Sequence, residues 1–188
     1  MRLIAWVGLA LLSGLLQGCL PGAIQSEAPG GLVGQDRRAE GARSDDAEIE
    51  AKAAELVYDQ SRVFMHVNVS SFNRKVLVSG EVPNEATRSE VEKSVASIEK
   101  AGEIISELTV GNSSSMLSRS NDSLITSNVK LKFVADRRFD SNHVRVVTEN
   151  GTVFLMGIVK RSEADAAAGT ASTAKGVQRV VKLFEYMD

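Results

Sequence analysis

An internal repeat constrains the fold of this 188-residue chain more than any other feature. The letters Val-Asn-Val at 67–69, followed by Val-Leu-Val-Ser-Gly at 76–80, recur as Val-Arg-Val at 144–146 and Val-Phe-Leu-Met-Gly at 153–157, and every position is shifted by 77 residues. Self-similarity at a fixed period indicates two copies of one structural unit. The chain is therefore expected to fold as two small, related domains.

Each copy contains a predicted strand-turn-strand unit. In the second copy, Glu149-Asn150-Gly151 joins the strands, and Asn-Gly is a strong signal for a tight hairpin turn with positive φ at both central residues. The first copy has Phe72-Asn73-Arg74 at the same place. We expect its turn to be less ideal.

Helical patterns surround both hairpins. The first begins near Ser44 and Asp45, the candidate N-caps, and places apolar residues at helical spacing, and Asn121 with Asp122 similarly precedes a helix from about 123 to 135. Segments 84–100 and 162–175 also favour helices, and 104–110 and 179–187 favour strands. The predicted class is α/β, as an α+β sandwich. Each domain runs helix-strand-strand-helix-strand, with a small three-stranded mixed sheet packed on two helices.

The N-terminus has the pattern of a lipoprotein export signal. A single Arg2 precedes an apolar run from Leu3 to Leu15, which is shorter than the roughly 20 residues of a membrane-spanning helix, and Leu16-Gln17-Gly18-Cys19 follows it. We expect a signal peptide at 1–18, acylation of Cys19, and a flexible tether over 19–43 that is rich in Gly, Ala and Pro. An uncleaved anchor is the alternative.

The sorting of the protein follows from the same motif. Residue Leu20 after the cysteine is not an aspartate, and by resemblance to bacterial lipoproteins this implies the outer membrane, with the lipid-anchored chain facing the periplasm. Since Cys19 is the only cysteine, neither a disulfide nor a thiolate metal site is expected.

The two predicted domains, 44–110 and 121–188 with a linker at 111–120, differ in charge. Residues 45–110 contain 13 acidic and 7 basic side chains, a net of −6, whereas residues 119–188 contain 8 acidic and 11 basic ones, a net of +3. The second half is therefore better suited to an anionic partner. A solvated surface without a partner is the alternative.

The second copy resembles a known family. The segment from Val144 to Val159, with Val-x-Val, Asn-Gly and Val-x-Leu-x-Gly-x-Val, and the later Gly176-Val177-Gln178-Arg179-Val180 are similar to the BON domain of bacterial envelope proteins. Two such domains behind a lipidation motif resemble the dual-BON outer-membrane lipoproteins. The resemblance implies phospholipid binding or envelope adhesion, support of outer-membrane integrity, and lipid contact by the helix that opens the second domain.

No constellation of residues indicates catalysis. The histidines, His66 and His143, occupy matching repeat positions, which favours a shared structural role over a catalytic pair, and neither has metal-ligand spacing to a second candidate. Gly80 and Gly157 are expected at strand ends, without a phosphate-binding loop. We expect no enzyme activity, no cofactor and no metal.

The helix that opens the second domain is the candidate binding element. On a helical wheel, Ile125, Val129 and Phe133 form the inward stripe, while Leu124 and Leu131 lie on nearly the opposite side. Exposed leucines beside cations are typical of an interfacial helix. The expected lipid-contacting residues are Leu124, Ile125, Ser127, Asn128, Lys130, Leu131, Val134 and Arg138. Alternatively, the two leucines pack against the first domain.

The sequence therefore predicts a non-enzymatic outer-membrane lipoprotein that binds anionic, phosphatidylglycerol-like phospholipid, supports envelope integrity and localises to the division site. No nucleic-acid partner is expected. The alternative is a periplasmic scaffold or adaptor that uses the same face to hold an envelope assembly complex or a cell-wall enzyme regulator.

Overall fold

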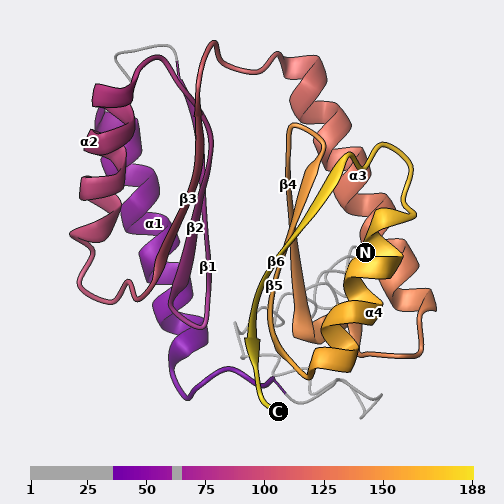
Figure 1. Cartoon of the computed structure of the whole chain (residues 1–188). Coiled ribbons are helices and arrows are strands. Elements are labelled where there is room, and N and C mark those ends of the chain that lie inside the picture. The colour runs from indigo at the N-terminus through magenta and orange to yellow at the C-terminus, as the bar shows by residue number, and fades with distance from the viewer. Residues whose placement is uncertain (1–35, 61–64) are drawn as a thin grey trace, which may run out of the picture. The chain divides into compact units, whose positions relative to one another are not determined.

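The first domain follows the predicted order of elements. The computed structural model describes residues 36–60 and 65–188, so the expected signal peptide and Cys19 lie outside the described residues. The elements are α1 (Ala42–Gln60), β1 (His66–Phe72), β2 (Lys75–Val82), α2 (Glu85–Ala96) and β3 (Ile104–Val110) (Figure 1). The sheet order is β1-β2-β3, with β1 antiparallel and β3 parallel to β2.

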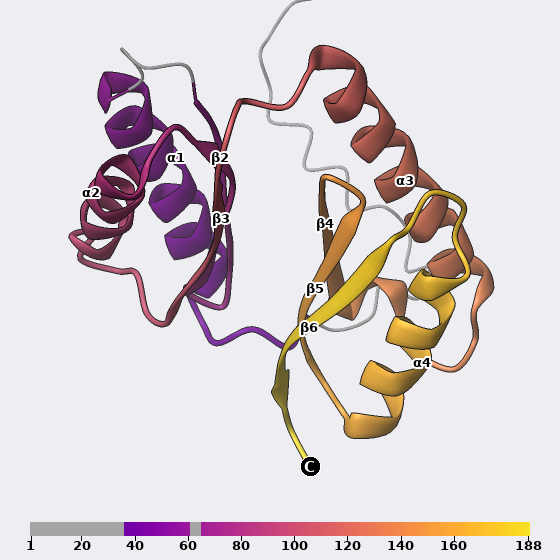
Figure 2. The same ribbon diagram turned by 45° about the horizontal axis from the view of Figure 1, so that its top comes forward.

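The second domain repeats this plan. Its elements are α3 (Met116–Ala135), the short 3-10 helix η1 (Ser141–His143), β4 (Val144–Glu149), β5 (Thr152–Val159), α4 (Arg161–Ser172) and β6 (Arg179–Tyr186). The sheet order is β4-β5-β6, again with one antiparallel and one parallel pair. Figures 1 and 2 show that the two helices of each domain cover the same face of its sheet. The predicted fold, with a mixed three-stranded sheet on two helices, is confirmed.

Each domain has its own apolar core between its sheet and its helices. In the first domain Ile49 and Ala53 of α1 meet Val76 and Val78 of β2, as the helical spacing predicted. In the second domain Ile125, Val129 and Phe133 of α3 pack on the central strand β5 and on the alanines of α4. The small alanine side chains allow α4 to approach the sheet closely.

The two central strands are buried on both faces. Leu77 of β2 and Met156 of β5 are fully buried, although their side chains point away from the helices of their own domains. Together with Phe72 and Phe154 they form a third apolar cluster that joins the two domains, which belong to one compact unit, 34–188. Burial on both faces explains why the apolar runs at 76–78 of β2 and 153–156 of β5 do not alternate with polar residues.

Polar contacts surround this third cluster. Asn68 donates to the Glu149 carboxylate across 2.7 Å, and Asn73 donates to Glu185 across 2.9 Å. Arg145 of β4 forms an ion pair with Glu50 of α1 at 2.8 Å. The question of whether the domains touch, which the sequence left open, is answered by these contacts.

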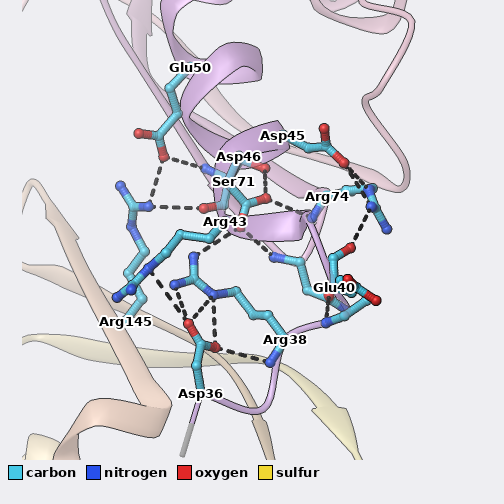
Figure 3. Close-up of polar contacts among 12 residues, drawn as sticks. Asp36, Arg38, Glu40, Arg43, Asp45, Asp46, Glu50, Ser71, Arg74 and Arg145 are labelled. Carbon is cyan, nitrogen blue, oxygen red and sulfur yellow. Dashed lines mark hydrogen bonds and ion pairs between the residues drawn. The ribbon is translucent and has the colours of Figure 1, made fainter.

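A buried aspartate supports each hairpin turn. Asp46 of α1 accepts hydrogen bonds from the backbone N–H groups of Asn73 and Arg74 and from the Ser71 hydroxyl (Figure 3). Asp122 of α3 accepts the N–H groups of Asn150 and Gly151 in the same way. The predicted N-caps, Ser44, Asp45, Asn121 and Asp122, thus lie inside α1 and α3. Of these, Asp122 supports a hairpin turn instead, and in the first domain that role belongs to the neighbouring Asp46.

These contacts also explain the first turn, which the sequence made doubtful. Asn73 and Arg74 adopt φ values of 53° and 67°, close to the 47° and 72° of Asn150 and Gly151. Positive φ costs a residue with a side chain roughly 1 kcal/mol. The two hydrogen bonds from this turn to the Asp46 carboxylate offset that cost, so both hairpins have the same turn.

Candidate functional site

Helix α3 is longer than the sequence indicated. It begins at Met116 rather than near residue 123, because Ser115 is its N-cap and accepts a hydrogen bond from the Ser118 N–H at 3.1 Å. The expected linker at 111–120 therefore contains the first turn of the helix. The Asn112-Ser113-Ser114-Ser115 run of that expected linker supplies the cap.

The outward face of α3 carries a continuous apolar stripe. Leu117, Leu124 and Leu131 follow one another at intervals of seven residues and are 80%, 64% and 69% exposed. Met116 and Val134, at 72% and 74%, widen the stripe at its two ends. Residues seven apart lie on the same side of a helix, so these five side chains form one surface. We call it the α3 apolar face.

This exposure excludes one sequence alternative. Leu124 and Leu131 do not pack against the first domain, since more than half of each side chain faces solvent. Met116 and Leu117 were missing from the predicted lipid-contacting residues because the sequence analysis assigned them to the linker. The seven-residue spacing between Leu117, Leu124 and Leu131 was the signal that could have identified Leu117.

The serines beside the stripe are already hydrogen-bonded within the helix. Ser120, Ser123 and Ser127 donate their hydroxyls to the carbonyls of Met116, Arg119 and Ser123, at 2.9, 3.1 and 2.9 Å. A hydroxyl costs free energy on leaving water unless it keeps a hydrogen bond. The hydroxyl donors of this face can therefore enter an apolar phase at a reduced cost.

The cations around the face differ in their availability. Lys130 and Lys132 are exposed and form no ion pair with any residue in 36–60 or 65–188. Arg138, which the sequence also proposed, donates to the Asp136 carboxylate at 2.9 and 2.7 Å and to Thr170 at 2.9 Å. Hydrogen bonding by Arg138 lowers the pKa of Asp136. Thus the charge of Arg138 is partly neutralised, and the two lysines are the freer cations.

The other predicted contact residues divide into two groups. Ser127, Asn128, Lys130 and Val134 are exposed with the leucines, as the wheel placed them. Ile125 is only 2% exposed and lies in the core of the second domain beside Val129 and Phe133. Its inclusion among the lipid-contacting residues is corrected here, because its side chain faces the sheet and holds the helix in place from beneath.

The described residues contain neither a metal-binding group nor a membrane-spanning helix. Within 36–60 and 65–188, no group of three His, Cys, Asp or Glu side chains is placed to hold a metal ion. His66 lies 3.5 Å from Glu149, at the contact between the domains. In the same ranges, no helix is both long and apolar enough to cross a membrane.

Comparisons with known proteins give relatives of similar length. The chain is 37% identical to "Outer membrane lipoprotein DolP" of Haemophilus influenzae over 185 residues, 96% of both chains. It is 34% identical to the "21 kDa hemolysin" of Actinobacillus pleuropneumoniae, covering 81% of this chain and 79% of that one. It is 28% identical to "Osmotically-inducible protein Y" of Escherichia coli, covering 82% and 79%.

The family model for the BON domain matches twice, at 45–112 and at 121–188. These ranges cover both copies of the helix-strand-strand-helix-strand unit except the first residues of α1 and α3, and they include both buried aspartates and both hairpins. The chain therefore belongs to the BON domain family, with two such domains in tandem.

Proposed function

We propose that this protein is an outer-membrane lipoprotein, anchored through Cys19, whose second domain binds anionic phospholipid with the α3 apolar face. The observation that carries the proposal is the stripe of Leu117, Leu124 and Leu131, which is exposed over the whole helix while the opposite face fills the core. Large apolar patches that a folded protein leaves in solvent are typical of membrane or protein contact sites.

The hydrogen-bonded serines and the free lysines favour lipid over protein. Lys130 and Lys132 can approach anionic headgroups while the leucines enter the boundary between headgroups and acyl chains. Burying a leucine contributes roughly 1.5 to 3 kcal/mol, and each cation near an anionic surface about 1 kcal/mol. Three leucines and two lysines can therefore supply several kcal/mol before the entropy of binding is subtracted.

The relatives support the location. The protein from Haemophilus influenzae, similar over 96% of both chains, is named an outer-membrane lipoprotein, and this agrees with the lipidation motif at Leu16-Gln17-Gly18-Cys19. The lipid on Cys19 would hold the chain at the membrane, and a second contact through α3 would reinforce that attachment. We infer a role in envelope integrity and, more specifically, localisation of the protein to the division site.

Vesicle co-sedimentation tests the lipid proposal. The segment 35–188, which lacks the lipidated cysteine, should bind vesicles that contain phosphatidylglycerol and should bind purely zwitterionic vesicles at least tenfold more weakly. Leu124→Asp and Leu131→Asp should each abolish binding while circular dichroism shows an unchanged fold. Tyr58→Asp is the matched control, since Tyr58 is a helical residue that is 77% exposed on the first domain.

The outcomes separate the two candidate functions. Binding that falls with salt and follows the headgroup identifies a lipid-binding face. If all vesicles give equal or no binding, the lipid proposal fails and the scaffold or adaptor alternative takes its place, with the same leucine variants as probes for protein partners.

A further inference from the structure

We propose that the first domain binds an extended, positively charged peptide segment of another protein, which adds as a further strand along the outer edge of β1. This inference concerns a different domain from the lipid-binding face and does not depend on it. In the order β1-β2-β3, one side of β1 pairs with β2, and no strand in the described part of the chain pairs with its other side. An unpaired edge is a template for an extended backbone.

The register shows which backbone groups face outward. Phe72 pairs with Lys75 across the two-residue turn, so this pair is hydrogen-bonded and the pattern then alternates along the strand. The N–H and C=O groups of Val67, Val69 and Ser71 consequently point away from β2. Ser71 agrees, since its N–H donates outward to Glu50 at 2.7 Å.

The edge is closed at one end and open at the other. The Ser71 carbonyl accepts from Arg145 at 2.9 Å, so both outward groups of Ser71 are occupied. The outward groups of Val67 and Val69 have no partner among the described residues. Their side chains pack against the core of the first domain, which holds this stretch of backbone extended. Two donors and two acceptors are therefore presented at strand spacing.

A cavity lies along the open part of the edge. It has a volume of about 380 Å³ and is lined by Glu50, Ala54, Val57 and Tyr58 of α1 and by residues 65–69. Tyr58 is 77% exposed at its border. In strand addition, backbone bonds hold the peptide and pockets for alternate side chains select it. This cavity is placed to receive such a side chain.

The second domain covers the start of the corresponding edge with its own residues. Val144, which is 77 positions after Val67, donates its N–H to the Ser141 carbonyl. The rings of Phe133 and Phe139 pack edge to face, with centroids 4.9 Å apart, and Phe133 stands 76 positions after Val57. The N–H of Val67, free among the described residues and beside a cavity, therefore distinguishes the first copy from the second.

Charge determines the kind of peptide. The first domain has a net charge of −6 over 45–110, and among the described residues no lysine or arginine lines the cavity. The Glu50 carboxylate at the cavity is already paired with Arg145, so the attraction comes from the charge of the domain as a whole. A segment that alternates basic and apolar side chains is complementary to this surface. A second copy of this chain fits less well, because its β1 would bring its own α1 and Tyr58 against the same edge.

Fluorescence anisotropy with a defined probe tests the proposal on the full lipidated protein in neutral detergent. The probe is a dye-labelled Lys-Ile-Lys-Val-Lys-Ile peptide. The same peptide with N-methyl groups on alternate amides keeps its side chains but loses the donors of one edge. We expect the methylated probe, and the acidic analogue Glu-Ile-Glu-Val-Glu-Ile, to bind at least tenfold more weakly.

Two pairs of variants locate the site. Ala54→Trp fills the cavity and Val69→Pro removes one outward N–H, and each should weaken probe binding at least tenfold. Ala51→Trp, on α1 but outside the cavity lining, and Val146→Pro, at the repeat position of Val69, should leave it unchanged in folded protein. Equal binding of the methylated probe, no binding, or equal loss in the control variants would overturn the proposal. A dimer that Val69→Pro dissolves would also overturn it, in favour of a second copy.

Discussion

At the level of single residues, two glycines are required by a neighbouring backbone. A Cβ atom on Gly157 would lie 2.2 Å from the carbonyl oxygen of His143, and one on Gly80 would lie 2.0 Å from that of His66. These distances are far below van der Waals contact, and a backbone carbonyl in a strand cannot move aside as a flexible side chain can. The histidines take part through their main chains, so this contact does not depend on their side chains.

Gly157→Ala should therefore destabilise the second domain by about 3 kcal/mol or more, since overpacking against a fixed backbone forces the strands apart. The matched control is Gly169→Ala in α4, where an added Cβ meets nothing within 4 Å. That change should stabilise the helix by up to about 1 kcal/mol. Urea denaturation of both variants checks the pair, and a Gly157→Ala protein as stable as the parent would refute the steric argument.

The sequence predicted these glycines at strand ends, whereas they lie within β2 and β5. The letters show that a glycine is present, but not that a carbonyl approaches it, because that approach depends on the pairing of two strands. Ile125 shows the opposite situation. The helical wheel had already placed it on the inward stripe, so its burial was predictable from spacing alone.

At the level of elements, the beginning of a helix was the hardest feature to predict. The N-cap of α3 is Ser115, which follows two other serines, and only the hydrogen bond to the Ser118 N–H distinguishes it from them. The hairpins were easier, because Asn-Gly and strand alternation are local signals. The long-range capping of both hairpins by Asp46 and Asp122 could not be predicted without the packing of helix on sheet.

The beginning of α4 offers a test by pH. The Arg37 side chain donates to both carboxylate oxygens of Glu163, at 2.6 and 3.0 Å, and this lowers the pKa of Glu163 from 4.5 to about 2. Because the folded-state pKa lies below the unfolded value, the contribution to stability is present above pH 4.5 and is lost as the pH falls towards 2.

Glu163→Gln should accordingly remove about 1 to 2 kcal/mol of stability at pH 7 and almost none at pH 2. Thermal unfolding of the parent and the variant across this range measures the difference. Glu90→Gln is the control, because Glu90 is exposed and forms no ion pair in the described part of the chain. If the two variants show the same pH dependence, the Arg37 contact contributes no stability.

At the level of the whole molecule, the apolar cluster between the two sheets should couple the domains. Met156 and Leu77 are fully buried there, so separating the domains exposes them to water. We expect the parent protein to unfold in a single transition. Met156→Asp places a charge in this cluster and should separate the unfolding of the two domains into two transitions.

Differential scanning calorimetry follows this coupling, with Val134→Asp as the control, because Val134 is 74% exposed and lies outside the cluster. A single transition in the Met156→Asp protein would show that the domains are coupled by other contacts. The repeat predicted two domains from sequence, but their association depends on strand faces that each domain turns away from its own helices. No local pattern encodes that partner.

Gly157 and Asp122 both contact backbone groups rather than side chains, and this bears on how two copies of one domain can differ. Gly157 leaves room for a neighbouring backbone carbonyl, and Asp122 accepts hydrogen bonds from the N–H groups of a turn. Both contacts lie in the interior of the domain. The two copies therefore share these interior contacts, while their outer surfaces differ. The first copy has an open strand edge at β1, and the second has an exposed apolar face on α3. Each copy therefore needs its own functional assignment.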